Sequence, residues 1–265
     1  MDLVCGEGSS TESGNDPQIV VRAKLRRDVI SAGVCLSEAV SHAVLDTLDL
    51  PVAEAFAVTV GDDFARDLSV QCGFDPPVIP GRHWGTRRLQ MNVQEIECSP
   101  DLIETLSDPL QPLRIFLADV LLANPDRRTM GNVLYARESG SEKYFLIPID
   151  QSDCFGHPRR FTQPGGLDEI CERQMAAWLE GTEAGVMDSA PRALEREFRR
   201  IEEERDSILS CVEAPPEEWY DATGISPEAV QNFLTYRIDH FADLARQGYW
   251  NDLTHFGEVS LFDPQ

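Results

Sequence analysis

The most constraining feature of this sequence is an apolar helix that is followed at once by a polar loop and a β-hairpin. Apolar side chains recur at helical spacing at Leu113, Phe116, Leu117, Val120 and Leu121. This spacing places them on one face, so it predicts a buried helix that ends at Asn124-Pro125. Two strand-like runs follow, residues 132–136 (NVLYA) and 143–149 (KYFLIPI), and the polar turn between them predicts a hairpin.

The helix, loop and hairpin bring three oxygen-bearing side chains towards one place. Asp126 lies in the loop, Asn132 at the start of the first strand and Asp150 just after the second. Carboxylate and amide oxygens suit Mg²⁺, which takes its other ligands from substrate phosphates and water. A loop carboxylate can also accept a proton from an attacking hydroxyl. The alternative interpretation is structural, because Asp and Asn are common in caps and turns.

The N-terminal part of the chain predicts a small β-α-β lobe. Residues 18–25 (QIVVRAKL) and 55–60 (AFAVTV) are apolar and partly β-branched, which favours strands. Between them, residues 36–48 carry apolar side chains at helical spacing, and Pro51 ends the predicted helix. Residues 61–112 show no strong periodicity, and their Pro-Pro and Pro-Gly pairs indicate turns.

The C-terminal part of the chain is predicted to be mainly helical. Helical periodicity and few β-branched residues predict helices over residues 167–179, 190–211 and 227–246. The expected fold class is therefore α+β with two lobes. The expected N-terminal lobe is small, β-rich and carries one helix (residues 1–100), and the C-terminal lobe is larger and mainly helical (residues 101–265).

Charge and cysteine usage restrict the class of protein. The chain has 265 residues with 23 Lys and Arg against 46 Asp and Glu, a net charge of −23. Nucleic acids and anionic membranes are bound by clustered cations, so we expect no direct nucleic-acid binding and no membrane docking. The seven cysteines have no C-x-x-C spacing, and the N-terminus lacks the pattern of a signal peptide. No apolar run approaches the length of a membrane span, so we expect a cytoplasmic protein with reduced thiols.

The loop and hairpin carry a resemblance to a known family. The residues Asn124-Pro125-Asp126-Arg127, then Asn132-Val133-Leu134, then Ile149-Asp150, resemble the catalytic loop and metal-binding motif of HipA-like kinases. These kinases share the protein-kinase-like two-lobe fold with phosphoinositide kinases. The resemblance implies that Asp126 is the catalytic base and that Asn132 and Asp150 bind Mg²⁺. Asp126 and Asn132 are six residues apart, one more than in the usual motif, and Asn124-Pro125 replaces the usual His-Arg.

The resemblance extends to a cation–carboxylate pair in the N-terminal lobe. Such kinases pair a strand lysine, which holds the ATP phosphates, with a glutamate on the following helix. Lys24 and Glu38 fit these two places, although both could also be ordinary surface charges. Arg22, on the same strand face, is the competing candidate. Lys24 is preferred because an ammonium acts on phosphate as a compact point charge.

A Gly-rich segment near the N-terminus is a candidate phosphate-binding loop. It contains Gly6, Gly8, Ser9 and Ser10. Backbone N–H groups of such loops cradle phosphate, but loose chain termini have the same composition.

These residues together predict an ATP- and Mg²⁺-dependent phosphotransferase that moves the γ-phosphate to a hydroxyl, with a protein as the expected acceptor. One alternative is a nucleotide-binding module or pseudokinase with little transferase activity, motivated by the Asp126–Asn132 spacing. The other is a metal-dependent phosphohydrolase that uses the Asp cluster without Lys24. The sequence leaves open whether the acceptor is a protein or a small molecule, and whether a regulatory protein partner exists.

Arginines near the expected site make an anionic ligand compatible with the acidic chain. They are Arg82, Arg87, Arg88, Arg127, Arg128, Arg159 and Arg160. Arg127, Arg128, Arg159 and Arg160 flank the expected site and could bind phosphate, and salt bridging at the surface is the expected role of at least half of these four.

Overall fold

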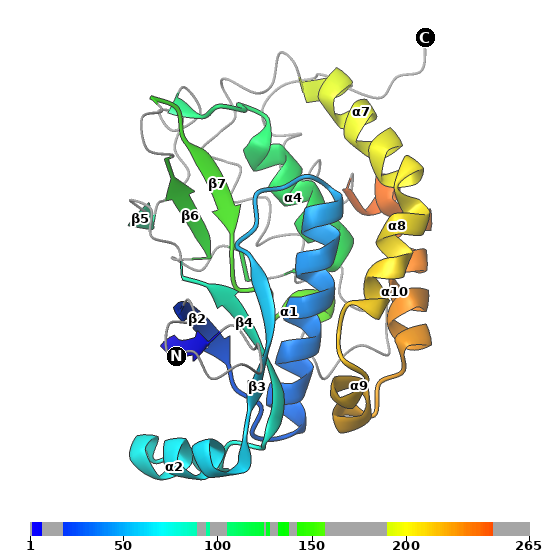
Figure 1. Cartoon of the computed structure of the whole chain (residues 1–265). Coiled ribbons are helices and arrows are strands. Elements are labelled where there is room, and N and C mark those ends of the chain that lie inside the picture. The colour runs from blue at the N-terminus through cyan, green and yellow to red at the C-terminus, as the bar shows by residue number, and fades with distance from the viewer. Residues whose placement is uncertain are drawn as a thin grey trace.

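The computed structural model describes residues 2–6, 18–88, 94–95, 105–124, 126–127, 132–137, 142–156 and 190–245. An antiparallel sheet with two helices, one more than expected, forms the N-terminal part, and a larger, mainly helical part follows (Figure 1). The expected α+β class with a small β-rich lobe and a larger helical lobe is thus confirmed. The expected boundary at residue 100 lies outside the described residues.

The N-terminal sheet has four antiparallel strands in the order β1-β2-β4-β3. The strands are β1 (Asp2–Gly6), β2 (Gln18–Lys24), β3 (Ala55–Val60) and β4 (Gly81–Arg87). The expected strands at 18–25 and 55–60 are confirmed as β2 and β3. The central strand β4, however, lies in the segment for which the sequence indicated turns. Its composition explains the error, because His, Gly and Arg interrupt any alternation of apolar residues in GRHWGTR.

Helix α1 (Val29–Thr47) packs between this sheet and the C-terminal helices (Figure 1). Its first turn is held by a capping box, in which Ser31 N donates to Asp28 Oδ1 and Asp28 N donates to Ser31 Oγ, both at 2.8 Å. The helix therefore begins seven residues before the expected start at residue 36. Apolar periodicity missed this part because the apolar Val29 and Ile30 are exposed, 62% and 37%, whereas the buried positions that follow are the small residues Ala32 and Gly33.

The same helix is the one described helix that is long and apolar enough to cross a membrane by length and composition. It has 19 residues and a mean hydropathy of 1.3, and 61% of the stretch is buried inside the protein. Core packing accounts for this apolar character, because the core helix of a folded domain meets the same criterion.

Helix α2 (Asp62–Cys72) also lies in the segment for which only turns were indicated. Its apolar stripe is narrow, since only Ala65, Leu68 and Ser69 are buried along it. Asp62 and Asp63 lie in its first turn, where the helix dipole favours negative charge. Gly73 ends the helix in the left-handed conformation, with φ of 65°.

Helix α4 (Gln111–Leu122) and a second sheet form the frame of the C-terminal part. The expected buried helix is confirmed, with eleven of its residues buried. The expected hairpin is confirmed as β6 (Val133–Ala136) and β7 (Phe145–Pro148), and β5 (Gln94–Glu95) pairs with β6. The Gln111 amide joins helix and hairpin, since its Nε2 donates to the Leu146 carbonyl at 2.9 Å and its Oε1 accepts from Leu146 N at 2.8 Å.

The C-terminal helices pack around α1 and α4. They are α7 (Ala190–Glu203), α8 (Arg205–Ser210), α9 (Glu217–Thr223) and α10 (Pro227–Asp239). The expected helix over 190–211 was wrong as one continuous element, because it divides at Glu204 into α7 and α8. The one expected over 227–246 ends as α10 at Asp239, and residues 241–245 are helical again. The helix expected over 167–179 lies outside the described residues.

One large apolar core joins the two parts of the chain. Leu36, Val40 and Val44 of α1 are fully buried in the same cluster as α4 and α10. A smaller cluster underneath the N-terminal sheet contains Val21, Val58 and Leu68. Because α1 belongs to the large core, its register relative to the C-terminal part is set by packing.

Gly85 on the central strand β4 has no room for a larger side chain. A Cβ at Gly85 would lie 2.3 Å from Val21 Cγ1 and 2.9 Å from Val58 Cγ2. We therefore expect Gly85→Ala to lower the free energy of unfolding by about 1–3 kcal/mol, measured by urea denaturation. Gly61→Ala is the matched control, since nothing lies within 4 Å of its Cβ position. Equal losses in the two variants would contradict the packing argument.

Candidate active site

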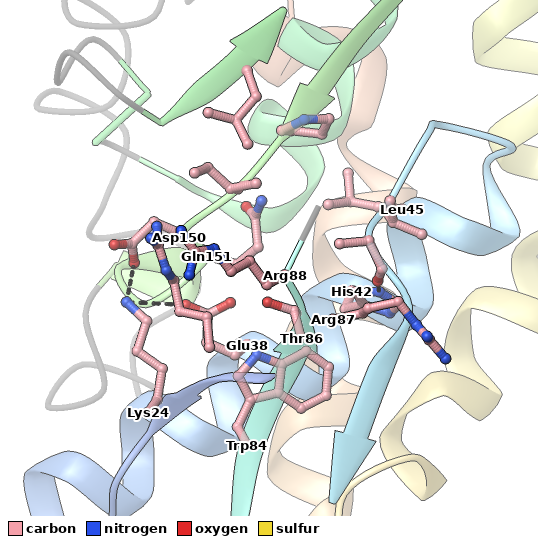
Figure 2. Close-up of a pocket in the computed structure, with 16 residues that line it drawn as sticks. Lys24, Glu38, His42, Leu45, Trp84, Thr86, Arg87, Arg88, Asp150 and Gln151 are labelled. Atoms are coloured by element: carbon pink, nitrogen blue, oxygen red, sulfur yellow. Dashed lines mark hydrogen bonds and ion pairs between the residues drawn. The ribbon is translucent and has the colours of Figure 1, made fainter. Parts of the chain in front are cut away.

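A cavity of about 440 Å³ lies where the N-terminal sheet meets the end of β7 (Figure 2). Its N-terminal wall comes from β2, β4 and α1, and its C-terminal wall from β6, β7 and the residues after β7. Lys24, Glu38 and Asp150 all line it. Lys24 and Glu38 are each more than a hundred residues away from Asp150 in the sequence, yet all three are neighbours at one concave site.

Lys24 connects the two walls of the cavity. It is the last residue of β2, and its Nζ lies 2.8 Å from Asp150 Oδ1 and 3.5 Å from Glu38 Oε1 (Figure 2). Burial acts to lower the pKa of the Lys24 ammonium, but attraction to Glu38 and Asp150 outweighs burial, so the pKa is raised. The ammonium therefore stays protonated at neutral pH.

Glu38 is the buried carboxylate of this cluster. It is 4% exposed on α1. Burial, and after it the nearby charge of Asp150, raises its pKa to about 7 although the attraction of Lys24 lowers it. The carboxyl of Glu38 is thus poised to change charge near neutral pH.

Asp150 sits directly after β7 in an unusual backbone conformation. Its φ is 55°, the left-handed region that a residue with a Cβ rarely adopts. Burial acts to raise its pKa, but Lys24 more than compensates and the pKa is lowered. Ser152 Oγ donates to Asp150 Oδ1 at 2.6 Å, so this carboxylate is held ionised and oriented. Such strained positions concentrate at functional sites.

Asp126 and Asn132 are joined directly by hydrogen bonds. Asn132 Nδ2 donates to the Asp126 carbonyl at 2.8 Å and to Asp126 Oδ2 at 2.9 Å. Asp126 N in turn donates to Asn124 Oδ1 at 3.1 Å, which closes the turn after α4. The extra residue between Asp126 and Asn132 therefore does not separate them in space. Since the amide nitrogen of Asn132 is used in these bonds, its Oδ1 is the atom suited to a metal.

Arg127 lies in the interior, not at the phosphate-facing surface. Its guanidinium forms a bidentate ion pair with Asp119 at 2.9 Å for both contacts, and both side chains are 1% exposed. It also donates to the Asn132 carbonyl at 2.6 Å, the Ile149 carbonyl at 2.8 Å and Gln151 Oε1 at 2.7 Å. For Arg127 the expected phosphate or surface role was wrong, because its guanidinium is buried and joins the loop to α4 and to the hairpin.

The donor set near Asp126 and Asp150 fits magnesium. Among the described residues there is no group of three or more His, Cys, Asp and Glu that could hold a metal by itself. One or two carboxylates and an amide oxygen, completed by phosphate and water, are nevertheless what Mg²⁺ accepts. Asp150 and Asn132 are the residues of this chain that would hold it. Ile149 N donates to the Asn132 carbonyl at 3.0 Å, which keeps the backbone next to Asp150 close to that of Asn132.

The remaining expected site residues are placed less fully. Gly6 ends β1 opposite Gln18, whereas Gly8, Ser9 and Ser10 lie outside the described residues. Arg22 lines the same cavity as Lys24, so both candidates for the phosphate cation face it. Lys24 contacts the carboxylates of both Glu38 and Asp150.

The cavity also has walls that sequence reasoning missed. His42, Trp84, Thr86 and Gln151 line it, and the rings of His42 and Trp84 meet edge to face at 5.3 Å. His42 could have been found, because it follows Glu38 by four residues and therefore lies on the same face of the helix. Trp84 and Thr86 could not, because β4 was not predicted.

Comparisons with known proteins give limited information. No protein-family model matches the sequence, and no curated protein matches it either. Among solved structures, the crystal structure of a Helicobacter pylori proinflammatory kinase, CtkA, is similar with a TM-score of 0.49 and 16% identity. The likeness covers 92% of this chain and 93% of that chain. With a TM-score below 0.5, this likeness does not indicate a function. A function for this chain has to be inferred from the residues of the site.

The buried ion pair predicts a large loss of stability when one partner is removed. In Asp119→Asn the charge of Arg127 remains in the interior without its counter-ion, so unfolding free energy should fall by about 3–5 kcal/mol. The control is Asp63→Asn, which breaks an exposed pair with Arg66 at 2.7 Å and should change stability little. Both are measured by chemical denaturation. A similar small effect in the two variants would mean that the Asp119–Arg127 pair does not hold the loop.

The raised pKa of Glu38 predicts a specific pH dependence of stability. Its pKa is about 7 in the folded protein against an ordinary value of 4.5, so the folded state holds an extra proton between these values. The contribution of Glu38 to stability is therefore complete below about pH 4.5 and is lost as pH rises towards about 7. Glu38→Gln cannot ionise and should lack this loss. Unfolding free energies from about pH 5 to about pH 8 should show the variant gaining on the wild type. A constant difference would contradict the raised pKa.

Proposed function

We propose that this chain is an ATP- and Mg²⁺-dependent phosphotransferase of HipA-like kind, which transfers the γ-phosphate to a hydroxyl group, with a protein as acceptor. The observation that carries the proposal is the cluster of Lys24, Glu38 and Asp150 at the cavity, next to the Asp126–Asn132 loop. A strand cation anchored by a helix carboxylate, facing a carboxylate after a hairpin, is similar to the arrangement that protein kinases use for phosphoryl transfer.

Each residue has a separate part in this mechanism. Lys24 would bind phosphate oxygens and neutralise their charge, while Glu38 fixes the direction of its side chain. Asn132 and Asp150 would hold Mg²⁺, which would offset the negative charge of the phosphates.

Asp126 is the proposed proton acceptor. In the transfer step the bond between the γ-phosphorus and the bridging oxygen breaks, and a bond from the acceptor hydroxyl oxygen to phosphorus forms. The hydroxyl proton passes to Asp126, whose Oδ2 is held by the Asn132 amide at 2.9 Å. Because Arg127 ties this loop to the carbonyls of Asn132 and Ile149 in the hairpin, Asp126 would act without large rearrangement of its surroundings.

One observation favours a second candidate, a nucleotide-binding module with little transfer activity. Asp150 Oδ1 accepts from both Lys24 and Ser152, so this ligand atom must give up a contact before it binds a metal.

The decisive experiment uses labelled ATP, Mg²⁺ and single variants of the purified protein. The chain contains only two lysines, so Lys143→Met is a matched control for Lys24→Met. Lys24→Met, Asp126→Asn and Asp150→Asn should each lower label transfer by roughly 100-fold or more, whereas Lys143→Met should leave it unchanged.

The other outcomes identify the alternatives. Tight ATP binding without transfer by the wild type would support the binding module. Phosphate release that is insensitive to Lys24→Met would support a phosphohydrolase. If the wild type transfers phosphate, mass spectrometry of lysate treated with it and with Asp126→Asn identifies the acceptor.

A further inference from the structure

Helix α9 contacts the back of the proposed phosphate-binding elements, although it lies almost two hundred residues away from them in sequence. In Figure 1 it lies beside α1, and its contacts also reach β4. Two consecutive residues of α9, Glu218 and Trp219, make these contacts. Neither belongs to the cavity or to the resemblance at the catalytic loop.

Glu218 binds the short segment that connects Lys24 to α1. Its Oε1 accepts from Arg26 Nη2 at 3.1 Å and from the backbone N of Arg82 at 2.7 Å. The Arg26 side chain is 6% exposed, so Glu218 neutralises an interior charge two residues after Lys24. Gly81 permits this approach, since a Cβ there would lie 2.6 Å from Arg26 Nη2.

The backbone of the same segment is held against β4. Arg26 N donates to His83 Nδ1 at 2.8 Å, and Ile79 N donates to the Arg26 carbonyl at 3.0 Å. Burial, assisted by the charge of Arg26, lowers the pKa of His83 to about 4, so the ring is neutral and can accept this bond. The segment that Glu218 binds is therefore also held through its backbone.

Trp219 contacts the other end of the connection, on α1. It is 1% exposed and packs in one cluster with Cys35, Ala39 and Trp84, while its Nε1 donates to the Arg82 carbonyl at 2.8 Å. Ala39 follows Glu38 directly, and Cys35 Sγ donates to the Lys24 carbonyl at 3.3 Å. Trp219 thus supports the helix on which Glu38 lies and, through Cys35, the strand end that carries Lys24.

We propose that Glu218 and Trp219 are positioning residues, which hold Lys24 and Glu38 in place for the phosphate of the ligand. The role assigned to that phosphate rests on the proposed function. Helix α9 packs against α1, and its Glu218 binds the segment that connects β2 to α1. Displacement of Glu218 or Trp219 therefore changes the distances from Lys24 Nζ to the carboxylates of Glu38 and Asp150. The C-terminal part of the chain thereby contributes to the geometry of Lys24 and Glu38.

The test reads the position of Lys24 directly. Lysine labelled with ¹³C at the ε-carbon gives two NMR signals, and the Lys143→Met variant assigns the one from Lys24. In Glu218→Gln the Lys24 signal should move towards that of the exposed Lys143, and the KM for ATP should rise roughly tenfold with a smaller change in kcat. Trp219→Phe keeps an aromatic ring but loses the bond to Arg82, so it should give a smaller shift in the same direction.

The matched control is Glu217→Gln, which removes the same charge from an exposed residue one position earlier. It should leave the Lys24 signal and the KM unchanged. A Lys24 signal identical in Glu218→Gln and wild type would overturn the proposal, whatever the activity. A shifted Lys24 signal in a protein whose wild type transfers no phosphate would support the positioning role and refute the proposed function. Glu218 is itself 37% exposed and Glu218→Gln preserves the size of its side chain, so this variant tests the proposal even where a Trp219 variant fails to fold.

Discussion

The buried ion pair of Arg127 and Asp119 is the interaction on which the geometry of the site depends. Taking two charges out of water is costly, and the cost is offset only where their remaining hydrogen-bonding groups are satisfied. Here Arg127 also binds the carbonyls of Asn132 and Ile149 and the Gln151 amide oxygen. The end of α4, the loop and both strands of the hairpin thus converge on one guanidinium. Asp126, Asn132 and Asp150 each lie at or next to a residue that this ion pair holds, so a buried interaction sets their relative positions.

The N-terminal lobe is attached to this frame through α1. Helix α1 is buried in the large core together with α4, and it presents Glu38 to Lys24 on its other side. Lys24 then reaches Asp150 across the cavity. One helix therefore transmits the arrangement of the C-terminal core to the sheet, and α9 supports it from behind through Trp219.

The charge distribution at the cavity differs from that of the whole chain. The net charge is −23, yet the cavity wall includes Arg22, Lys24, Arg87 and Arg88 beside the carboxylates of Glu38 and Asp150. A strongly acidic protein can therefore hold a phosphate-bearing ligand, because the local field at a concave site is set by its nearest charges. Overall acidity restricts the surface partners of the chain more than it restricts the ligand of the cavity.

The sequence by itself determined those features that have a local signal. Helical spacing identified α4, apolar runs identified β2, β3 and the hairpin, and the compact loop motif singled out Asp126, Asn132 and Asp150. It did not reveal α2 or β4, whose apolar patterns are weak, nor the interior place of Arg127, which looks like any charged residue in a loop. Only the tertiary structure decided which residues meet: Lys24 lies 126 residues from Asp150, and Arg26 lies 192 residues from Glu218. The physical reason is that such contacts arise from packing of the whole core, and no local periodicity encodes them.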